Sequence, residues 1–231
     1  NGVEDTITKA AGVKYITLDH DKTKSSTAPT LGHCVYNTLS YTNYLDGAMK
    51  DVRLWDTDRT QEQIVADMNK TLTGQEEGLM HYWKLDESQG AVAADSVGTN
   101  NIALTGNTVS WIGEAGLYLP GVNQPLMIAQ KATATIPQTV EMWVKLDSTS
   151  QANIHALVSA YNAKTQVAIA GDWQLDIKNG KVRWVDMTGK GKSGQLFGAS
   201  VIPKDQWVHL AVTREAGSVK FYVNGQLDAT V

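Results

Sequence analysis

The stretch WVHLAVTREAGSVKFYVNG (residues 207–225) decides the fold, because it contains two strands and two turns. Apolar residues recur at every second position on both sides of Ala216-Gly217, as they do in strands with one buried face. Asn224-Gly225 then supplies two residues that accept positive φ angles, which a type I′ hairpin turn requires. The stretch therefore predicts antiparallel strands joined by tight turns.

A second hairpin is predicted in DWQLDIKNGKVRWVDM (residues 172–187). Trp173, Leu175 and Ile177 alternate with polar residues, and Asn179-Gly180 supplies the turn before the alternation resumes. The same period-two pattern predicts further strands at residues 13–18, 49–55, 79–85, 139–146 and 154–160.

One helix is predicted, in DTDRTQEQIVADMNK (residues 56–70). The Thr60 hydroxyl can accept a hydrogen bond from the amide of Gln63 while the Gln63 side chain reaches back, which is a capping box. Ile64, Val65 and Met68 make one apolar stripe. One short helix among so many strands predicts an all-β fold, an antiparallel β-sandwich of jelly-roll type.

Composition excludes several classes of protein. The 231 residues are 42% hydrophobic and 19% charged, and the net charge is −4 without a long run of one sign. We therefore expect a globular protein with no nucleic-acid partner. No apolar run approaches 18 residues, so we expect no membrane insertion. The single cysteine, Cys34, excludes an internal disulfide framework.

Four segments resemble one known family. GAMKDVRLWDTDRTQEQIVADM (residues 47–68) resembles the closing strand and helix of laminin-G-like, concanavalin A-like jelly-roll domains. GLMHYWKLDESQGAVAADSVGTNNIAL (78–104) resembles their opening strand and the loop after it. TVEMWVKLD (139–147) is similar to one of their strands, and the 207–225 stretch is similar to one of their hairpins. The resemblance covers most of the chain and implies a concanavalin A-like jelly-roll sandwich.

The order of these motifs is rotated, because the closing motifs precede the opening ones. This order predicts one permuted laminin-G-like sandwich, made of residues 1–78 as the C-terminal half of one repeat and 79–231 as the N-terminal half of the next. The halves could instead belong to a tandem array cut between repeats, or could close between neighbouring chains.

Segments 1–7 and 224–231 support a repeating module. Both begin with Asn-Gly and carry an Asp four residues on, and they lie 223 residues apart. If the two halves close on each other, both segments compete for one strand position. We therefore expect one of them to be frayed or to pair with a neighbouring molecule.

The seven tryptophans raise the question of a sugar-binding surface, because exposed aromatic rings stack on sugar rings. The resemblance places Trp55, Trp83, Trp143 and Trp207 in the core and Trp111 at a loop-to-strand position. Tyr161 and Trp173 flank NAKTQVAIAGD (residues 162–172) and are the remaining candidates for an exposed aromatic side chain. We therefore predict a ligand site at Tyr161, Asp172 and Trp173.

The family that the chain resembles also includes enzymes that hydrolyse glycans. Retaining enzymes of this kind require two carboxyl groups about 5–5.5 Å apart. Glu141 is followed by Trp143 two residues later and by Lys145 four residues later, so its strand offers no partner acid. Asp172 and Asp176 are about 13 Å apart along a strand, which is too far. We therefore expect no enzyme activity.

Calcium is the cofactor that the resemblance implies, because similar domains hold Ca²⁺ in oxygen-rich loops. ADSVGTNN (residues 94–101) offers Asp95, Asn100 and Asn101, and Asp51 could reach the same corner from the closing strand. The alternative is a plain loop with an Asx turn.

The resemblance implies a non-catalytic binding or adhesion module of a larger extracellular or cell-surface protein. Its expected partners are a glycan or protein ligand and the neighbouring repeats of the parent chain. The alternative is a structural spacer repeat without a ligand of its own, and a glycanase-like enzyme is the remote third reading.

Overall fold

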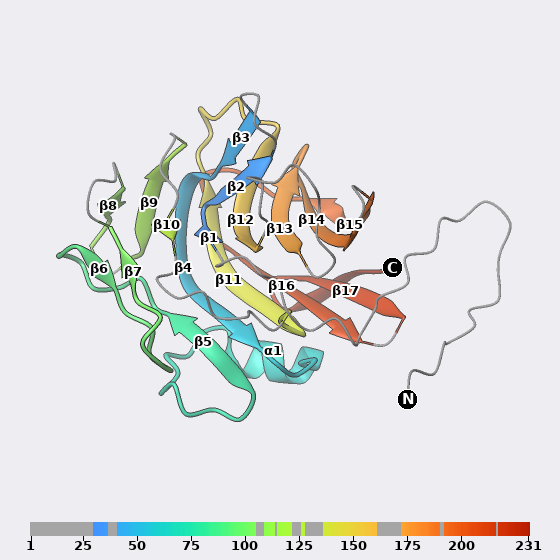
Figure 1. The fold of residues 1–231 in the computed structure, drawn as a ribbon, viewed down its shortest axis with the longest axis horizontal. Helices are drawn as coiled ribbons and strands as arrows, with labels where there is room; N and C mark the ends of the chain where they lie inside the picture. Colours follow the sequence, from blue (N-terminus) through green and yellow to red (C-terminus); the bar gives the residue numbers. More distant parts are fainter. Residues whose placement is uncertain are drawn as a thin grey trace, which may run out of the picture.

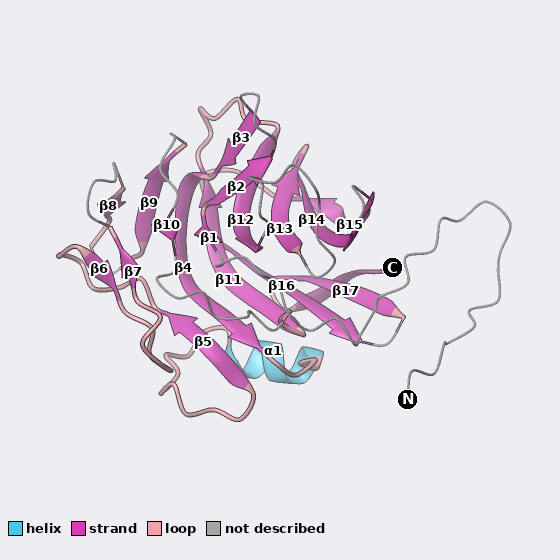
Figure 2. Cartoon of the chain, viewed as in Figure 1, coloured by secondary structure: helices cyan, strands magenta, loops and turns pink. Residues whose placement is uncertain are grey.

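The fold is described from a computed structural model of the chain. Two antiparallel sheets face each other, and a short helix lies at one end of the larger sheet (Figures 1 and 2). The structure describes residues 30–36, 41–104, 109–113, 115–121, 126–127, 136–160, 172–189, 192–215 and 217–231.

Most strands belong to one of two large sheets. The six-stranded sheet runs β10 (Leu126–Met127), β1 (Thr30–Leu31), β12 (Ile154–Ala160), β13 (Trp173–Lys178), β14 (Lys181–Gly189) and β15 (Lys192–Val201). The eight-stranded sheet runs β18 (Gln226–Thr230), β17 (Ser218–Val223), β16 (Val208–Glu215), β11 (Thr139–Leu146), β4 (Asp46–Trp55), β9 (Leu117–Pro120) and β8 (Ser110–Trp111), and β5 (Leu79–Trp83) also pairs with β4. Two small sheets pair β2 (His33–Tyr36) with β3 (Tyr41–Tyr44), and β6 (Val92–Ala93) with β7 (Ile102–Ala103).

The predicted antiparallel jelly-roll sandwich is confirmed. Strands β11 and β12 have the bounds predicted for them, and both predicted hairpins form, as β13–β14 and as β16–β17–β18. Asn179 and Asn224 adopt φ angles of 50°, as the type I′ turns require. The strand predicted at residues 13–18 lies outside the described residues.

The predicted helix is confirmed as α1 (Gln61–Asp67), which begins after Thr60 with both hydrogen bonds of the capping box. Its apolar stripe is narrower than predicted. Ile64 is fully buried against Ala211 and Tyr222, whereas Val65 is 43% exposed. Ile64 is therefore the one residue of the helix that is buried against the sheet, and the helix leaves part of the sheet surface beside it open.

The core lies between the two large sheets. Met49, Met142 and Leu210 enter it from the eight-stranded sheet, and Leu175 and Trp184 enter it from the six-stranded sheet. These residues alternate along their strands with side chains on the opposite face. For the eight-stranded sheet we call the face turned away from this core the outer face.

The two parts of the chain are interleaved in both sheets. Strand β4 comes from the first 78 residues, and it pairs with β11, β9 and β5 from the rest of the chain. Strand β1 lies between β10 and β12 in the same way. Their assignment to successive repeats of a parent array stays a prediction. The segment 1–7 lies outside the described residues, while β18 is paired to β17.

Gly47 permits the close approach of β4 to β11. Its φ is +151°, and a Cβ atom there would lie 2.2 Å from the carbonyl oxygen of Lys145. We expect Gly47→Ala to lower the free energy of unfolding by about 1–3 kcal/mol, because backbone must move to admit the methyl group. Gly90→Ala is the control, since Gly90 also has a positive φ but no atom near it. Equal losses for the two variants in urea unfolding would contradict this explanation.

Candidate functional site

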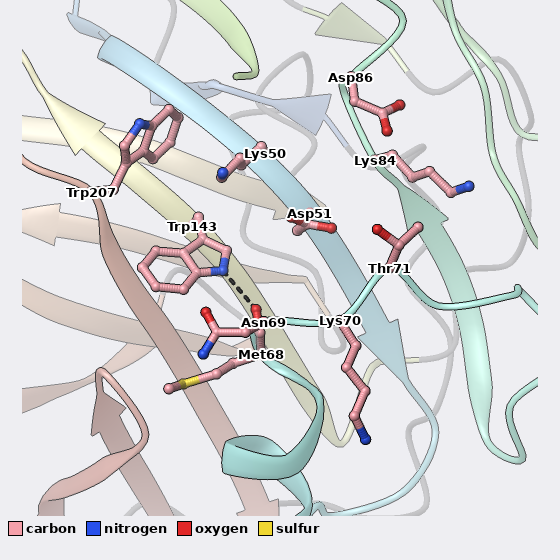
Figure 3. A pocket seen from close by; sticks show the side chains of 10 residues that line it. All are labelled: Lys50, Asp51, Met68, Asn69, Lys70, Thr71, Lys84, Asp86, Trp143 and Trp207. Carbon is pink, nitrogen blue, oxygen red and sulfur yellow. Dashed lines mark hydrogen bonds between the residues drawn. The ribbon is translucent and has the colours of Figure 1, made fainter. Parts of the chain in front are cut away.

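A cavity of about 350 Å³ opens on the outer face of the eight-stranded sheet, beside the C-terminal end of α1 (Figure 3). We call it the outer-face pocket. Its walls combine two indole rings with charged and amide side chains from β4, β11 and three loops. The lining residues are Lys50, Asp51, Met68, Asn69, Lys70, Thr71, Lys84, Asp86, Trp143 and Trp207.

A β-bulge in β4 shapes one wall of the pocket. Glu141 of β11 faces Arg53 and Trp143 faces Lys50, so two residues of β4 stand opposite one residue of β11. Asp51 lies in this bulge with a φ of 52°, in the left-handed region that few residues other than glycine adopt. Because of the extra residue, Lys50 and Arg53 both face outward although they are three positions apart.

The two tryptophans form the aromatic part of the pocket. Trp143 and Trp207 are each half-buried, and the Lys50 ammonium lies 6.0 Å from the first ring and 5.1 Å from the second. The Trp143 indole donates a hydrogen bond of 2.8 Å to the carbonyl oxygen of Met68, which fixes the ring (Figure 3). The prediction that both rings lie in the core is therefore wrong. They alternate with core residues and point outward, and α1 covers only part of that face.

Asp51, the acid in the pocket wall, is bonded to two neighbouring side chains. Asp51 accepts a 2.6 Å hydrogen bond from the Tyr82 hydroxyl, and Arg53 lies 3.4 Å from the same oxygen. Burial and the Asp51 carboxylate raise the pKa of Tyr82, so Tyr82 stays protonated and remains a donor. These contacts offset the negative charge that Asp51 presents to the pocket.

Buried charges beneath the pocket fix its rim. The Arg53 side chain is 1% exposed and donates hydrogen bonds to the carbonyl oxygens of Asp67, at 3.0 Å, and Lys70, at 2.6 Å. Helix C-termini leave such carbonyls without partners in the helix. Arg53 therefore ties the end of α1 and the loop after it to the sheet, and with them the residues that border the pocket.

Glu141 lies in the same buried layer. It is fully buried, accepts a 2.9 Å hydrogen bond from the Trp55 indole, and lies 3.6 Å from both Arg53 and His209. Burial raises the pKa of Glu141, and the nearby Arg53 and Arg59 oppose that rise. Burial lowers the pKa of His209 to about 3, so His209 is neutral at pH 7. The carboxylate is thus held by arginine and is not open to a substrate.

Three of the four predicted calcium ligands come together around His81. The Asp95 carboxylate bonds the His81 ring at 2.9 Å, and the Asn101 side chain accepts from the Asp95 amide at 2.9 Å. The Asn100 side chain lies 3.4 Å from the same ring. Asp51 does not join them, because it lines the outer-face pocket at the far end of Tyr82.

These residues do not offer a ready site for calcium. One Asp95 oxygen accepts from the amides of Tyr82 and Val97, each at 3.1 Å, and the other contacts His81. The bond from the Val97 amide closes an Asx turn, which is the structure we gave as the alternative to a calcium site. In the described residues no group of three or more His, Cys, Asp and Glu side chains is arranged to hold a metal. Calcium at Asp95, Asn100, Asn101 and Asp51 stays a prediction.

Asp95 gives the fold a specific acid sensitivity. Burial alone would raise its pKa, but the hydrogen bonds from His81, Tyr82 and Val97 outweigh burial and lower it. The ionised carboxylate therefore stabilises the fold fully above the unfolded pKa of about 3.9, and this contribution is lost as the pH falls through the folded value. We expect Asp95→Asn to flatten the decline in unfolding free energy below about pH 4. An unchanged acid limb in urea titrations at several pH values would contradict this.

The predicted ligand residues on the other sheet differ from expectation. Tyr161 lies outside the described residues. Trp173 was a candidate for an exposed aromatic side chain, and it is not exposed: the ring is fully buried and stacks on Trp184, with centroids 5.3 Å apart and planes 9° apart. Asp172 is fully buried as well. Ligand binding by these residues stays a prediction.

The sequence reading missed the pocket, although one signal for its bulge was available. Lys50 and Arg53 are three residues apart in GAMKDVRLW, which breaks the period-two pattern expected of a regular strand. Such a break indicates a bulge. The loop residues 69–71 carry no comparable signal, because their position depends on the bonds that Arg53 makes to Lys70 and Trp143 makes to Met68.

Comparison with known proteins gives a family match over the second half of the chain. In the described residues no helix is long and apolar enough to cross a membrane. No curated protein and no solved structure matches the chain significantly. Residues 120–231 match the family model described as the concanavalin A-like lectin/glucanases superfamily, a span that includes Trp143 and Trp207. The match covers just under half of the chain, and the antiparallel sandwich is consistent with the concanavalin A-like jelly-roll fold of that superfamily.

Proposed function

We propose that this sandwich is a non-catalytic carbohydrate-binding module and that the outer-face pocket holds the sugar. The observation that carries the proposal is the pair of half-buried rings, Trp143 and Trp207, lining one cavity. Indole rings offer flat apolar surface with a polar edge, which suits the C–H faces of a sugar ring. The volume of about 350 Å³ lies in the range of small-molecule sites.

The polar lining supports the same ligand class. Asn69, Thr71 and Asp86 are exposed at the rim and provide donors and acceptors for hydroxyl groups. The segment 68–71 is tied to the sheet by Arg53 and Trp143, so the site exists before the ligand arrives. Preformed sites lose less conformational entropy on binding.

The proposed function is binding without catalysis. Glu141 is the acid on the strand where the resemblance suggested a catalytic carboxylate, and it is sealed beneath the pocket by Trp55 and Arg53. Laminin-G-like domains are generally non-catalytic, extracellular binding modules, and we extend both properties to this chain. Adhesion through glycans on a cell or matrix surface follows as its role.

A glycan array tests the proposal, with and without millimolar calcium, because calcium binding stays a prediction. The chain is produced without N-glycosylation, since Asn69-Lys70-Thr71 is an acceptor sequence at the rim. We expect the wild type to bind a defined set of oligosaccharides. Trp207→Ala should weaken this binding by about 2 kcal/mol, or about 30-fold in Kd.

Trp111→Ala is the matched control, because Trp111 is also half-buried but does not line the pocket. It should bind as the wild type does. Binding of no glycan in either calcium condition would favour the structural spacer. Equal binding by Trp207→Ala and the wild type would place the ligand elsewhere on the molecule.

A further inference from the structure

We propose that the ligand of the outer-face pocket is an acidic sugar with one carboxylate per ring, a hexuronate, and that Lys50 holds its carboxylate. This inference rests on the proposed function and names its ligand class. It starts from a contrast in charge. The chain carries a net charge of −4, yet the pocket is lined by three lysines and two aspartates.

Contacts within the chain already pair some of these charges and leave others available to a ligand. Lys70 pairs with Asp67 at 3.2 Å, and Asp51 is bonded to Tyr82 and Arg53. Among the residues that the structure describes, no carboxylate lies within ion-pair distance of Lys50 or Lys84. Two lysines against Asp86 leave the pocket with one positive charge available to a ligand.

Lys50 is placed to bind an anion beside a stacked ring. Its ammonium lies near both indoles, at 5.1 Å from the Trp207 ring and 6.0 Å from the Trp143 ring, and it is half-buried. Interaction with ring faces orients the ammonium but uses none of its three hydrogen-bond donors in a strong bond. A half-buried cation gains most from an anionic partner. The carboxylate of a ring stacked on Trp207 would supply that partner.

Lys84 is held at the same wall by the bulge. Its carbonyl oxygen accepts a 2.9 Å hydrogen bond from the Asp51 amide, which fixes its backbone next to Lys50. Its ammonium lies 6.0 Å from the Tyr82 ring. Figure 3 shows Lys50 and Lys84 on either side of Asp51, both bordering the cavity. The Lys50 ammonium points toward the indoles, and the Lys84 ammonium points away from them (Figure 3). Lys50 is therefore the lysine placed to contact the carboxylate, Lys84 adds positive charge on the far side of Asp51, and Asp51 offers its carboxylate to a sugar hydroxyl.

The single available charge also limits the ligand. A hexuronate brings one negative charge per ring, which matches the pocket. A densely sulfated polymer brings several charges per disaccharide toward a protein whose net charge is −4, and its additional charges meet repulsion. We therefore assign the site to carboxylated rather than heavily sulfated glycans.

Matched oligosaccharides that differ only in charge test the inference. The probes are oligomers of galacturonate, glucuronate and mannuronate, each with its methyl ester, and a heparin oligosaccharide. At least one uronate should bind about tenfold or more tightly than its own methyl ester, because a charge-assisted bond is lost on esterification. Its affinity should fall as salt is raised from about 50 to 500 mM, and it should exceed that of heparin.

Lysine variants place the effect at the pocket. Lys50→Met should remove most of the difference between the uronate and its ester, and Lys84→Met should remove a smaller part of it. Lys220→Met is the matched control and should keep it, because Lys220 is paired with Glu215 at 2.6 Å and does not line the pocket. Circular dichroism and the melting temperature confirm that each variant is folded.

The outcomes separate the two proposals. If methyl esters bind as tightly as uronates and binding depends on Trp207, the pocket binds neutral sugars and the charge inference is overturned. Tighter binding of heparin than of every uronate also overturns it. If no probe or neutral glycan binds, both the inference and the proposed function fail.

Discussion

Replacing Arg53 by Met is expected to lower the free energy of unfolding by about 3–5 kcal/mol, because the change leaves a buried carboxylate without its cation. Glu141 is fully buried, and Arg53 lies 3.6 Å from it. The same substitution removes the hydrogen bonds to the carbonyls of Asp67 and Lys70, which anchor the end of α1. Urea unfolding followed by tryptophan fluorescence measures the loss.

A second substitution separates the two causes. In the double variant Arg53→Met with Glu141→Gln, no uncompensated carboxylate remains, and the Gln carbonyl can still accept the bond from the Trp55 indole. We expect the double variant to regain part of the lost stability. Arg53→Lys is the milder variant if Arg53→Met does not fold. If Arg53→Met and Arg53→Lys each lower the free energy of unfolding by less than about 1 kcal/mol, the buried layer does not hold α1.

Replacing Trp143 by Ala is expected to lower both stability and ligand affinity. The ring contacts His209 edge-on with centroids 5.3 Å apart, forms one wall of the pocket and bonds Met68. Its removal should cost about 2 kcal/mol or more in unfolding free energy, since large aromatic truncations leave cavities. Oligosaccharide binding should be lost at the same time.

Trp143→Phe is the control that keeps an aromatic ring and removes the indole N–H. It should lose about 1 kcal/mol of stability, the value of a single hydrogen bond, and retain part of the binding. Full binding by Trp143→Ala, measured by isothermal titration calorimetry on folded protein, would contradict the proposed role of this ring.

The fold could be predicted because its determinants are local. Period-two alternation identified the strands, Asn-Gly pairs identified the turns, and Thr60 with Gln63 identified the start of the helix. The repeated Asn-Gly-x-x-Asp pattern is local in the same sense. Asn224 accepts a bond from the His209 amide at 2.9 Å, and Asp228 accepts bonds from two amides of β15, at 2.7 and 3.1 Å.

The pocket could not be predicted because it depends on contacts across the sequence. Which side chains of β4 stand beside Trp143 depends on the register of β11 against β4 and on the bulge at Asp51. The loop residues at the rim depend on Arg53, 17 residues away from Lys70 in sequence. The family resemblance could suggest a calcium loop at Asp95, but not that its carboxylate oxygens would already be bonded within the chain.

The indole N–H signals of ¹⁵N-labelled protein test the central claim most directly, because the chain has seven tryptophans in different environments. The protein is titrated with the tightest-binding oligosaccharide of the panel. We predict that the signals of Trp143 and Trp207 shift with saturation, while those of the fully buried Trp55, Trp173 and Trp184 do not. Shifts confined to Trp111 or to the buried rings would contradict a sugar site at the outer-face pocket.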